Sequence, residues 1–328
     1  MSPQIRLLLS ALPLAVSLVW LFADAPVAVL REAWFVVLLT GATVLTRTIT
    51  WRGAVFGLSL GIGVAAPLMV AVGWLLARGG FDVSDSVVGS WLVVPILEEV
   101  VKLAPVILMA FLHRRRSRIT FNPSDWLLAG CAVGAGFAMV ENAELVQHSP
   151  GVLRDMAQQY GPSWLVPGAW GAAGFVGHAV ATGLAAAGIG GWALLSRMSA
   201  TRRAPAWAPW LTLVAPAAWV TLEHMLANYY VNTGSDAALL LGNGRLTPWL
   251  FLAAAAGVLA IDGAHQRRVL QHSRTLRIRQ TMVRDALLGA RAPVGVPLHR
   301  RLAAAGNELR VANATAWLTL ERLKGWTR

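Results

Sequence analysis

The sequence predicts an all-α membrane protein, a polytopic helical bundle of about eight transmembrane helices. Of its 328 residues, 56% are hydrophobic and only 13% are charged, which is about half the charged fraction of a typical soluble domain. The mean hydropathy is +0.57. The apolar residues gather in runs that are long enough to cross a bilayer as helices. Together these observations exclude an ordinary soluble enzyme and indicate a multi-spanning chain.

The predicted spans follow the apolar runs in chain order. The first run, 7–23, resembles a signal peptide, but Pro26 follows the small-residue site directly, and we interpret the run as an uncleaved first span. Seven further runs cover residues 33–45, 53–77, 87–112, 126–147, 165–195, 208–230 and 248–262. The sixth of the eight runs is too long for one straight helix, and its glycines permit a tilt, a break or a re-entrant piece.

The arginines predict how these spans are oriented. They cluster in alternate connections, at Arg47 and Arg52, at Arg114, Arg115, Arg116 and Arg118, and at Arg197, Arg202 and Arg203. The remaining connections hold one arginine each, at Arg31, Arg78, Arg154 and Arg245. Because cytoplasmic loops carry the excess of positive charge, we expect both termini to be cytoplasmic and the protein to reside in the plasma (inner) membrane.

The chain divides by composition into two parts. Residues 1–262 form the predicted transmembrane domain, and residues 263–328 form a basic tail with thirteen Lys and Arg against three acidic residues. The tail mixes basic and apolar residues, which predicts amphipathic helices lying on the anionic lipids of the cytoplasmic membrane face. Since it has no aromatic interleaving and no nucleic-acid-binding fold motif, we do not expect a nucleic-acid partner.

Three charged residues lie in the middle of the apolar run 87–112. Each of Glu98, Glu99 and Lys102 costs roughly 2.5–3.5 kcal/mol at the centre of a membrane helix, so together they require partners. Helical spacing pairs Lys102 with both glutamates, at i,i+4 and i,i+3. We therefore expect a polar stripe that faces a protein interior or a water-filled cavity. The alternative is an ion pair that only joins helices.

Further polar residues lie in three later spans. Glu141 and Glu144 share one helix face in the fifth span, His178 and Thr182 one in the sixth, and His224 and Asn228 one in the seventh. Their estimated depths predict that they meet Glu98 and Glu99 in one cavity between the midplane and the outer interface. Each also has a simpler interpretation, as a residue that joins helices or, for Glu144 and Glu223, as a solvated group near the interface.

These residue types suit hydrolysis. Two adjacent carboxylates in a low dielectric do not readily both ionise, so one can hold a proton while Lys102 keeps the other charged and able to activate a water. His178 or His224 can stabilise an oxyanion or protonate a leaving amine, with Asn228 as a second donor. Alternatively, His178, His224 and Glu141 could bind a divalent metal such as zinc. No cofactor is required by the pattern, and the residues alone leave this choice open.

The pattern resembles the PrsW family of intramembrane proteases, which is related to the CAAX prenyl endopeptidases and bacteriocin-processing enzymes. The matching motifs lie on successive spans within about residues 95–230, and they are Glu98-Glu99-x-x-Lys102, Phe137-x-x-x-Glu141-Asn142, His178-x-x-x-Thr182 and His224-x-x-x-Asn228. The resemblance implies paired catalytic glutamates at Glu98 and Glu99, followed by the acid Glu141 and the two histidines. Lys102, Phe137, Asn142 and Thr182 would support them.

The resemblance also implies a substrate and two possible mechanisms. The family is known for cleaving a membrane-anchored anti-sigma factor during stress signalling, so a single-pass membrane protein is the expected substrate. Members of the family are classed as metalloproteases, whereas relatives are described as glutamate proteases without a metal.

Two other classes of protein remain compatible with the residues. In a transporter or channel-like protein, Glu98, Glu99, Lys102 and Glu141 would relay protons or bind an ion. Such proteins often contain an inverted repeat with broken helices, and this sequence has none that we detect. In a non-catalytic membrane scaffold or immunity protein, the same motifs would only hold the bundle together.

Overall fold

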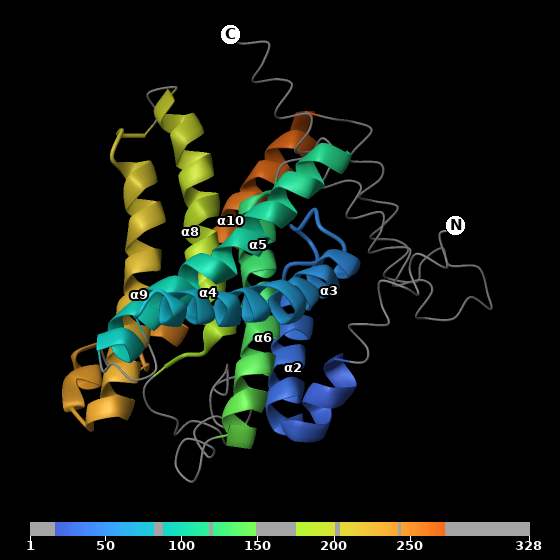
Figure 1. Ribbon diagram of the computed structural model, residues 1–328. Coiled ribbons are helices and arrows are strands. Elements are labelled where there is room, and N and C mark those ends of the chain that lie inside the picture. The colour runs from blue at the N-terminus through green and yellow to red at the C-terminus, as the bar shows by residue number, and fades with distance from the viewer. Residues whose placement is uncertain are drawn as a thin grey trace, which may run out of the picture.

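The structure is a computed structural model that describes residues 17–81, 88–117, 121–148, 175–200, 204–241 and 244–272. Within these ranges every regular element is helical (Figure 1). The predicted all-α class is therefore confirmed. Most of the first predicted span, 7–23, and most of the basic tail, 263–328, lie outside the described residues.

The first half of the described chain contains three helical segments. Residues 17–24 are helical and lead into α2 (Pro26–Ala42). The next segment runs continuously through α3 (Trp51–Leu60), the π-helical turn η1 (Gly61–Ala65) and α4 (Ala66–Arg78). Thr50 caps its start, because its hydroxyl oxygen accepts a hydrogen bond from the Gly53 amide at 3.2 Å.

The second half supplies the helices that carry the polar motifs. A π-helical turn, η2 (Gly89–Val93), leads directly into α5 (Val94–Ser117). The remaining elements are α6 (Pro123–His148), α8 (His178–Ala200), α9 (Ala208–Thr233), the short 3₁₀ helix η4 (Asp236–Leu241) and α10 (Thr247–His272). Helix α10 continues ten residues past 262, where composition led us to place the end of the transmembrane domain.

Helix α6 is the centre of the bundle. Most of its side chains are buried, and α2, α3, α5, α8 and α10 pack around it (Figure 1). Small residues allow the closest approaches. A Cβ atom at Gly134 would overlap the carbonyl oxygen of His178 on α8, and one at Gly136 would overlap the carbonyl oxygen of Leu58 on α3. Small residues at helix interfaces are the usual means of close packing between membrane helices.

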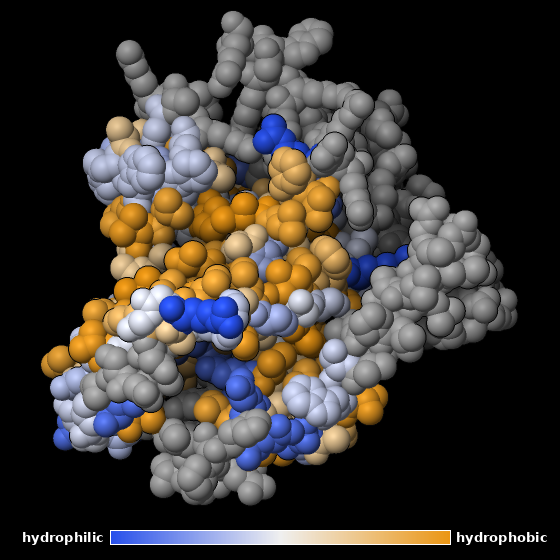
Figure 2. Space-filling view, in the orientation of Figure 1, coloured by the Kyte–Doolittle hydropathy of each residue, from blue (hydrophilic) through white to orange (hydrophobic). Residues whose placement is uncertain are grey.

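The outer surface of the bundle is apolar. Hydrophobic residues cover most of the described surface in Figure 2, and large exposed side chains include Val70, Trp74, Val100 and Trp249. Among the described residues, four helical segments are long and apolar enough to cross a membrane, namely Trp51–Arg78, Pro123–Gln147, His178–Ser196 and Thr247–Arg267. The prediction of a multi-spanning membrane protein is thus confirmed, whereas the total of eight spans stays a prediction.

The helix in the long run 165–195 does not begin where the apolar residues begin. Residues 165–174 lie outside the described ranges, residues 175–177 are not helical, and α8 starts at His178. Gly177 has a φ of 92°, a conformation that favours glycine, and its carbonyl accepts the first helical hydrogen bond, from Ala181 at 3.1 Å. His178 therefore stands at the first residue of α8, although it lies near the middle of the apolar run.

A buried polar junction joins three elements at the end of the bundle where α6 begins. The Asp125 carboxylate accepts hydrogen bonds from the backbone amides of Thr48 at 2.7 Å and Ile49 at 2.9 Å, and from the Thr48 hydroxyl. The Asp262 carboxylate of α10 accepts from the Ser124 amide at 2.8 Å. These bonds tie the α2–α3 connection and α10 to the start of α6.

Candidate active site

The paired glutamates lie on the buried face of α5. Glu98 and Glu99 are 6% and 5% exposed, and Lys102 is completely buried. The Lys102 ammonium donates to Glu99 Oε1 at 2.7 Å and lies 3.8 Å from Glu98 Oε2. The expected polar stripe on one helix face is therefore present. Lys102 holds Glu99 tightly and Glu98 loosely, so the two carboxylates have different surroundings.

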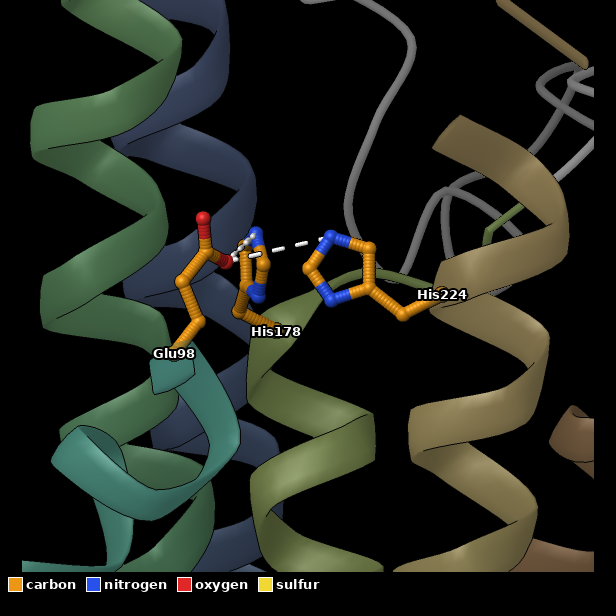
Figure 3. Close-up of side chains that lie close together, drawn as sticks. All are labelled: Glu98, His178 and His224. Atoms are coloured by element: carbon orange, nitrogen blue, oxygen red, sulfur yellow. Dashed lines mark ion pairs between the residues drawn. The ribbon is translucent and has the colours of Figure 1, made fainter. Parts of the chain in front are cut away.

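Two histidines meet Glu98 from two other helices. Glu98 Oε2 lies 3.9 Å from His178 Nε2 on α8 and 3.8 Å from His224 Nε2 on α9. Figure 3 shows the three side chains converging, with His178 at the end of its helix. The same histidine His224 approaches Glu99, with 3.6 Å between Nδ1 and Oε1. Glu98 Oε2 is buried and accepts no hydrogen bond from a described residue.

Glu141 brings α6 to the same cluster. Its Oε2 lies 2.5 Å from His178 Nε2, and its side chain is 30% exposed, far more than either glutamate of α5. On the other side of the ring, Lys102 Nζ lies 2.5 Å from His178 Nδ1. The His178 ring therefore stands between an ammonium group and a carboxylate.

Two phenylalanines fix the histidine rings. Phe137, expected as a supporting residue, packs edge-on against His178 with 5.0 Å between ring centroids, and Lys102 Nζ lies 4.9 Å from its centroid. Phe175 stacks on His224 at 4.4 Å and 19°, and also contacts His178 at 5.0 Å. Sequence reasoning missed Phe175, although its position three residues before a motif histidine was a usable signal.

The expected residues Glu98, Glu99, Glu141, His178 and His224 thus come together from α5, α6, α8 and α9. The side chain of Asn228 instead contacts η2, where its amide donates to the Ser90 carbonyl at 3.1 Å. Asn142 and Thr182 are buried, and they follow Glu141 directly on α6 and His178 by one turn on α8.

The two acidic residues that we considered as interfacial groups differ from each other. Glu144 is exposed, as expected for a solvated residue. Glu223, in contrast, is 2% exposed, and its Oε1 accepts a hydrogen bond from the Thr247 hydroxyl at 2.6 Å. Glu223 therefore joins α9 to the start of α10.

Three of the clustered groups fit a divalent metal. Ligand atoms of Glu98, His178 and His224 lie within 4.8 Å of one another, and all three residues are buried. A carboxylate with two imidazoles is an ordinary zinc ligand set, and Glu98 Oε2 is a buried acceptor without a hydrogen-bond donor among the described residues. We expected Glu141 to be the carboxylate ligand of a metal that His178 and His224 also bind. The structure groups Glu98 with the two histidines instead, because Glu98 Oε2 is the carboxylate oxygen that lies near both.

An apolar groove opens on the outer face of the helices that carry Glu98 and His224. It has a volume of about 370 Å³ and is lined by Ile96 of α5 and by seven residues of α9, from Leu213 to Met225. Ile96 precedes Glu98 by two residues, and Met225 follows His224 directly. The groove therefore lies on the apolar surface of the two helices that carry Glu98 and His224, and neither of these two residues lines it.

Comparison with known proteins agrees with the motifs. A family model described as PrsW family intramembrane metalloprotease matches residues 40–258, which is more than half of the chain and includes every residue of the cluster. Neither the curated proteins nor the solved structures gave a match. With the family match and the convergence of its motif residues in one buried site, the chain belongs to the PrsW family of intramembrane metalloproteases, and it is a multi-pass membrane protease.

Proposed function

We propose that this protease hydrolyses a peptide bond of a single-pass, membrane-anchored protein, and that Glu98 activates the attacking water. The observation that carries the proposal is the position of Glu98 Oε2, a buried acceptor within 4 Å of two histidines and a lysine. Glu99 is held by Lys102 and by the nearby His224, so it serves as a fixed charge and Glu98 is left to exchange protons.

The reaction needs a base and then an acid. Glu98 removes a proton from water while the water oxygen attacks the carbonyl carbon of the scissile bond. His178 and His224 lie where an N–H can donate a hydrogen bond to the developing oxyanion. The protonated Glu98 then gives its proton to the leaving nitrogen as the C–N bond breaks, so the carboxylate is restored and the protein returns to its starting state.

A divalent metal would be held by Glu98, His178 and His224. When bound, such an ion supplies a Lewis acid that polarises the carbonyl and lowers the pKa of a coordinated water. Under either mechanism Glu99 and Lys102 form the buried charge pair behind the reacting carboxylate, and the two phenylalanines hold the histidine rings in place.

The apolar groove supports a membrane-embedded substrate. A groove of about 370 Å³ on the outer face of α5 and α9, the helices that carry Glu98 and His224, suits apolar side chains of a helix that approaches from the lipid. A membrane-anchored anti-sigma factor that is cleaved during regulated proteolysis is a substrate of this kind.

The basic tail, 263–328, would bind anionic lipids on the cytoplasmic face, where both termini would lie.

The test is cleavage of a single-pass reporter by purified protein in lipid vesicles, with and without a chelator. We expect Glu98→Gln and Glu99→Gln to lose cleavage while insertion and expression stay nearly normal. Glu144→Gln is the matched control, because Glu144 is an exposed glutamate on the same helix as Glu141. Cleavage by Glu98→Gln at the wild-type rate would contradict the proposal. Loss of folding with Glu99→Gln would indicate a structural ion pair instead.

A further inference from the structure

The two nitrogens of the His178 ring face opposite kinds of hydrogen-bonding group. Nδ1 lies 2.5 Å from Lys102 Nζ, and Nε2 lies 2.5 Å from Glu141 Oε2. An ammonium group donates hydrogen bonds and cannot accept one, whereas a carboxylate accepts. The arrangement is satisfied when Nδ1 is the acceptor and Nε2 carries the hydrogen.

The surroundings hold the ring in this arrangement. Lys102 is completely buried, and its ammonium also donates to Glu99 at 2.7 Å, so it cannot turn away without leaving two partners. Phe137 and Phe175 each pack against the His178 ring at 5.0 Å between centroids. A second hydrogen on the ring would add a positive charge next to Lys102 and the positive end of α8, which begins at His178.

We propose that Lys102 is a positioning residue that fixes His178 as the Nε2–H tautomer, and that this tautomer competes with a divalent metal for the site. Metal coordination through Nε2 uses the lone pair of that nitrogen. A neutral imidazole has one N–H, so the hydrogen must first move to Nδ1, and there Lys102 offers no acceptor. In metal sites of proteins the second ring nitrogen usually donates to a carboxylate or carbonyl, which is the reverse of the arrangement at His178.

The tautomer also has a consequence for the proposed reaction. With the hydrogen on Nε2, His178 presents a donor to the space between Glu98 and Glu141, where the oxyanion and the leaving nitrogen would lie. Only this consequence rests on the proposed function. The tautomer itself and its competition with a metal depend on Lys102 and Glu141 alone.

The first test is zinc binding by calorimetry to the purified full-length protein in detergent, for wild type and three variants at Lys102. Lys102→Arg keeps a charged donor, Lys102→Met removes the charge without supplying an acceptor, and Lys102→Gln supplies an amide oxygen that can accept from Nδ1–H. We expect Lys102→Gln to bind zinc roughly 10-fold to 100-fold more tightly than Lys102→Met, as partners of metal-bound histidines do. Lys102→Arg should bind no more tightly than wild type.

The comparison between Lys102→Gln and Lys102→Met distinguishes the effect of the His178 tautomer on zinc affinity from the effect of removing the lysine charge. Equal zinc affinities of these two variants would overturn the proposal. Adding His178→Gln to Lys102→Gln should abolish the gain, because the gain acts through His178. A gain that persists without His178 would also overturn it.

The second test needs no substitution at Lys102, and so it holds even if those variants do not fold. The ¹⁵N NMR spectrum of histidine-labelled wild type should contain the signal of a neutral ring with a hydrogen on Nε2 and a bare Nδ1 that is absent from the spectrum of His178→Gln. A His178 ring with its hydrogen on Nδ1 would overturn the proposal. Neither test uses a cleavable substrate, so failure to cleave would count against the proposed function and not against the tautomer.

Discussion

The contacts of each residue in the site determine its role. Lys102 neutralises one of two adjacent carboxylates, and its hydrogen bond to Glu99 at 2.7 Å against 3.8 Å to Glu98 Oε2 decides which one. Removing one partner of a buried ion pair typically costs about 3–5 kcal/mol. Three charges can therefore be buried at one place on α5 only because they lie together, and the same grouping leaves Glu98 directed at the histidines.

Phe175 lies outside the family motifs, and its contacts predict what removal of its ring does to the reaction. Its ring stacks on His224 at 4.4 Å and contacts His178, so Phe175→Ala should let both histidines move. A displacement of about 1 Å in a catalytic group can lower the rate roughly 100-fold. We expect a loss of this order in reporter cleavage with near-normal expression, and Phe175→Tyr, which keeps the ring, should retain most activity. Equal rates for Phe175→Ala and wild type would show that the stacking does not position the histidines.

The convergence of the charged residues could be predicted from the sequence, whereas their contacts could not. Helical periodicity places Glu98, Glu99 and Lys102 on one face, and the cost of burying them demands partners. Nothing in the spacing of Asn228 shows that its amide donates to Ser90 at 3.1 Å, since that bond depends on how η2 packs on α9. The only signal for Phe175 is its position three residues before a motif histidine, and that spacing does not show that its ring stacks on His224.

At the scale of elements, the contact between α6 and α8 positions His178. Gly134 of α6 lies against the His178 carbonyl, and Gly130 lies against the Thr182 carbonyl one turn further along α8. Because the two backbones touch, the depth at which α8 begins is set by α6, the helix that also carries Glu141. A change at this contact should therefore affect both stability and the site.

The glycine contact predicts the effect of one methyl group. Gly134→Ala places a Cβ against backbone, which cannot move aside as a side chain could, so the helices must separate. Overpacking of this kind costs about 1–3 kcal/mol, and we expect a lower Tm together with slower reporter cleavage. Gly257→Ala on α10 is the matched control, because a Cβ there meets nothing within 4 Å. A Tm unchanged by Gly134→Ala but lowered by Gly257→Ala would contradict the described packing.

The polar junction at the start of α6 predicts how a substitution in α10 changes the stability of the protein. The Asp262 carboxylate of α10 accepts from both the amide and the hydroxyl of Ser124, at 2.8 Å and 2.5 Å. Asp262→Ala would leave these buried donors without their acceptor, at a cost of about 1–3 kcal/mol. We expect a lower Tm with reporter cleavage retained below the transition, because the junction is made by residues other than those of the cluster. Asp236→Ala, at the start of the short helix η4 and exposed, should leave Tm unchanged.

Apolar runs identified the helices but not all of their ends. The run 126–147 lies within α6, and the run 208–230 lies within α9, since both are bounded by prolines and polar residues that hydropathy detects. In the run 165–195 the apolar composition continues through the point where the helix begins. The start at His178 depends on the positive φ of Gly177, and a glycine in a run of small residues does not reveal which φ it adopts.

For the molecule as a whole, the distribution of exposed residues agrees with a membrane environment. Several exposed tryptophans lie near the ends of apolar helices, among them Trp51, Trp74, Trp207 and Trp249, whereas Trp34 is exposed in the middle of α2. Tryptophan is enriched at the two interfaces of a bilayer, where its ring is partly in hydrocarbon and its N–H reaches water. The same surface in a soluble protein would cause aggregation.

The orientation of the whole chain leads to a prediction that also tests the number of spans. Between Arg52 and Arg245 we predict five spans, namely 53–77, 87–112, 126–147, 165–195 and 208–230. An odd number of crossings puts the two exposed arginines on opposite sides of the membrane, and the positive-inside rule puts Arg52 in the cytoplasm. The chain has one cysteine, Cys131, which is buried and should give little background labelling.

We therefore expect a membrane-impermeant maleimide to label Arg245→Cys in intact cells and Arg52→Cys only after permeabilisation. The reverse pattern would invert the topology and place the cluster nearer the cytoplasmic face. Labelling of both positions from outside would mean an even number of crossings, in which case one of these five segments, α5 with its buried charges foremost, enters the membrane without crossing it.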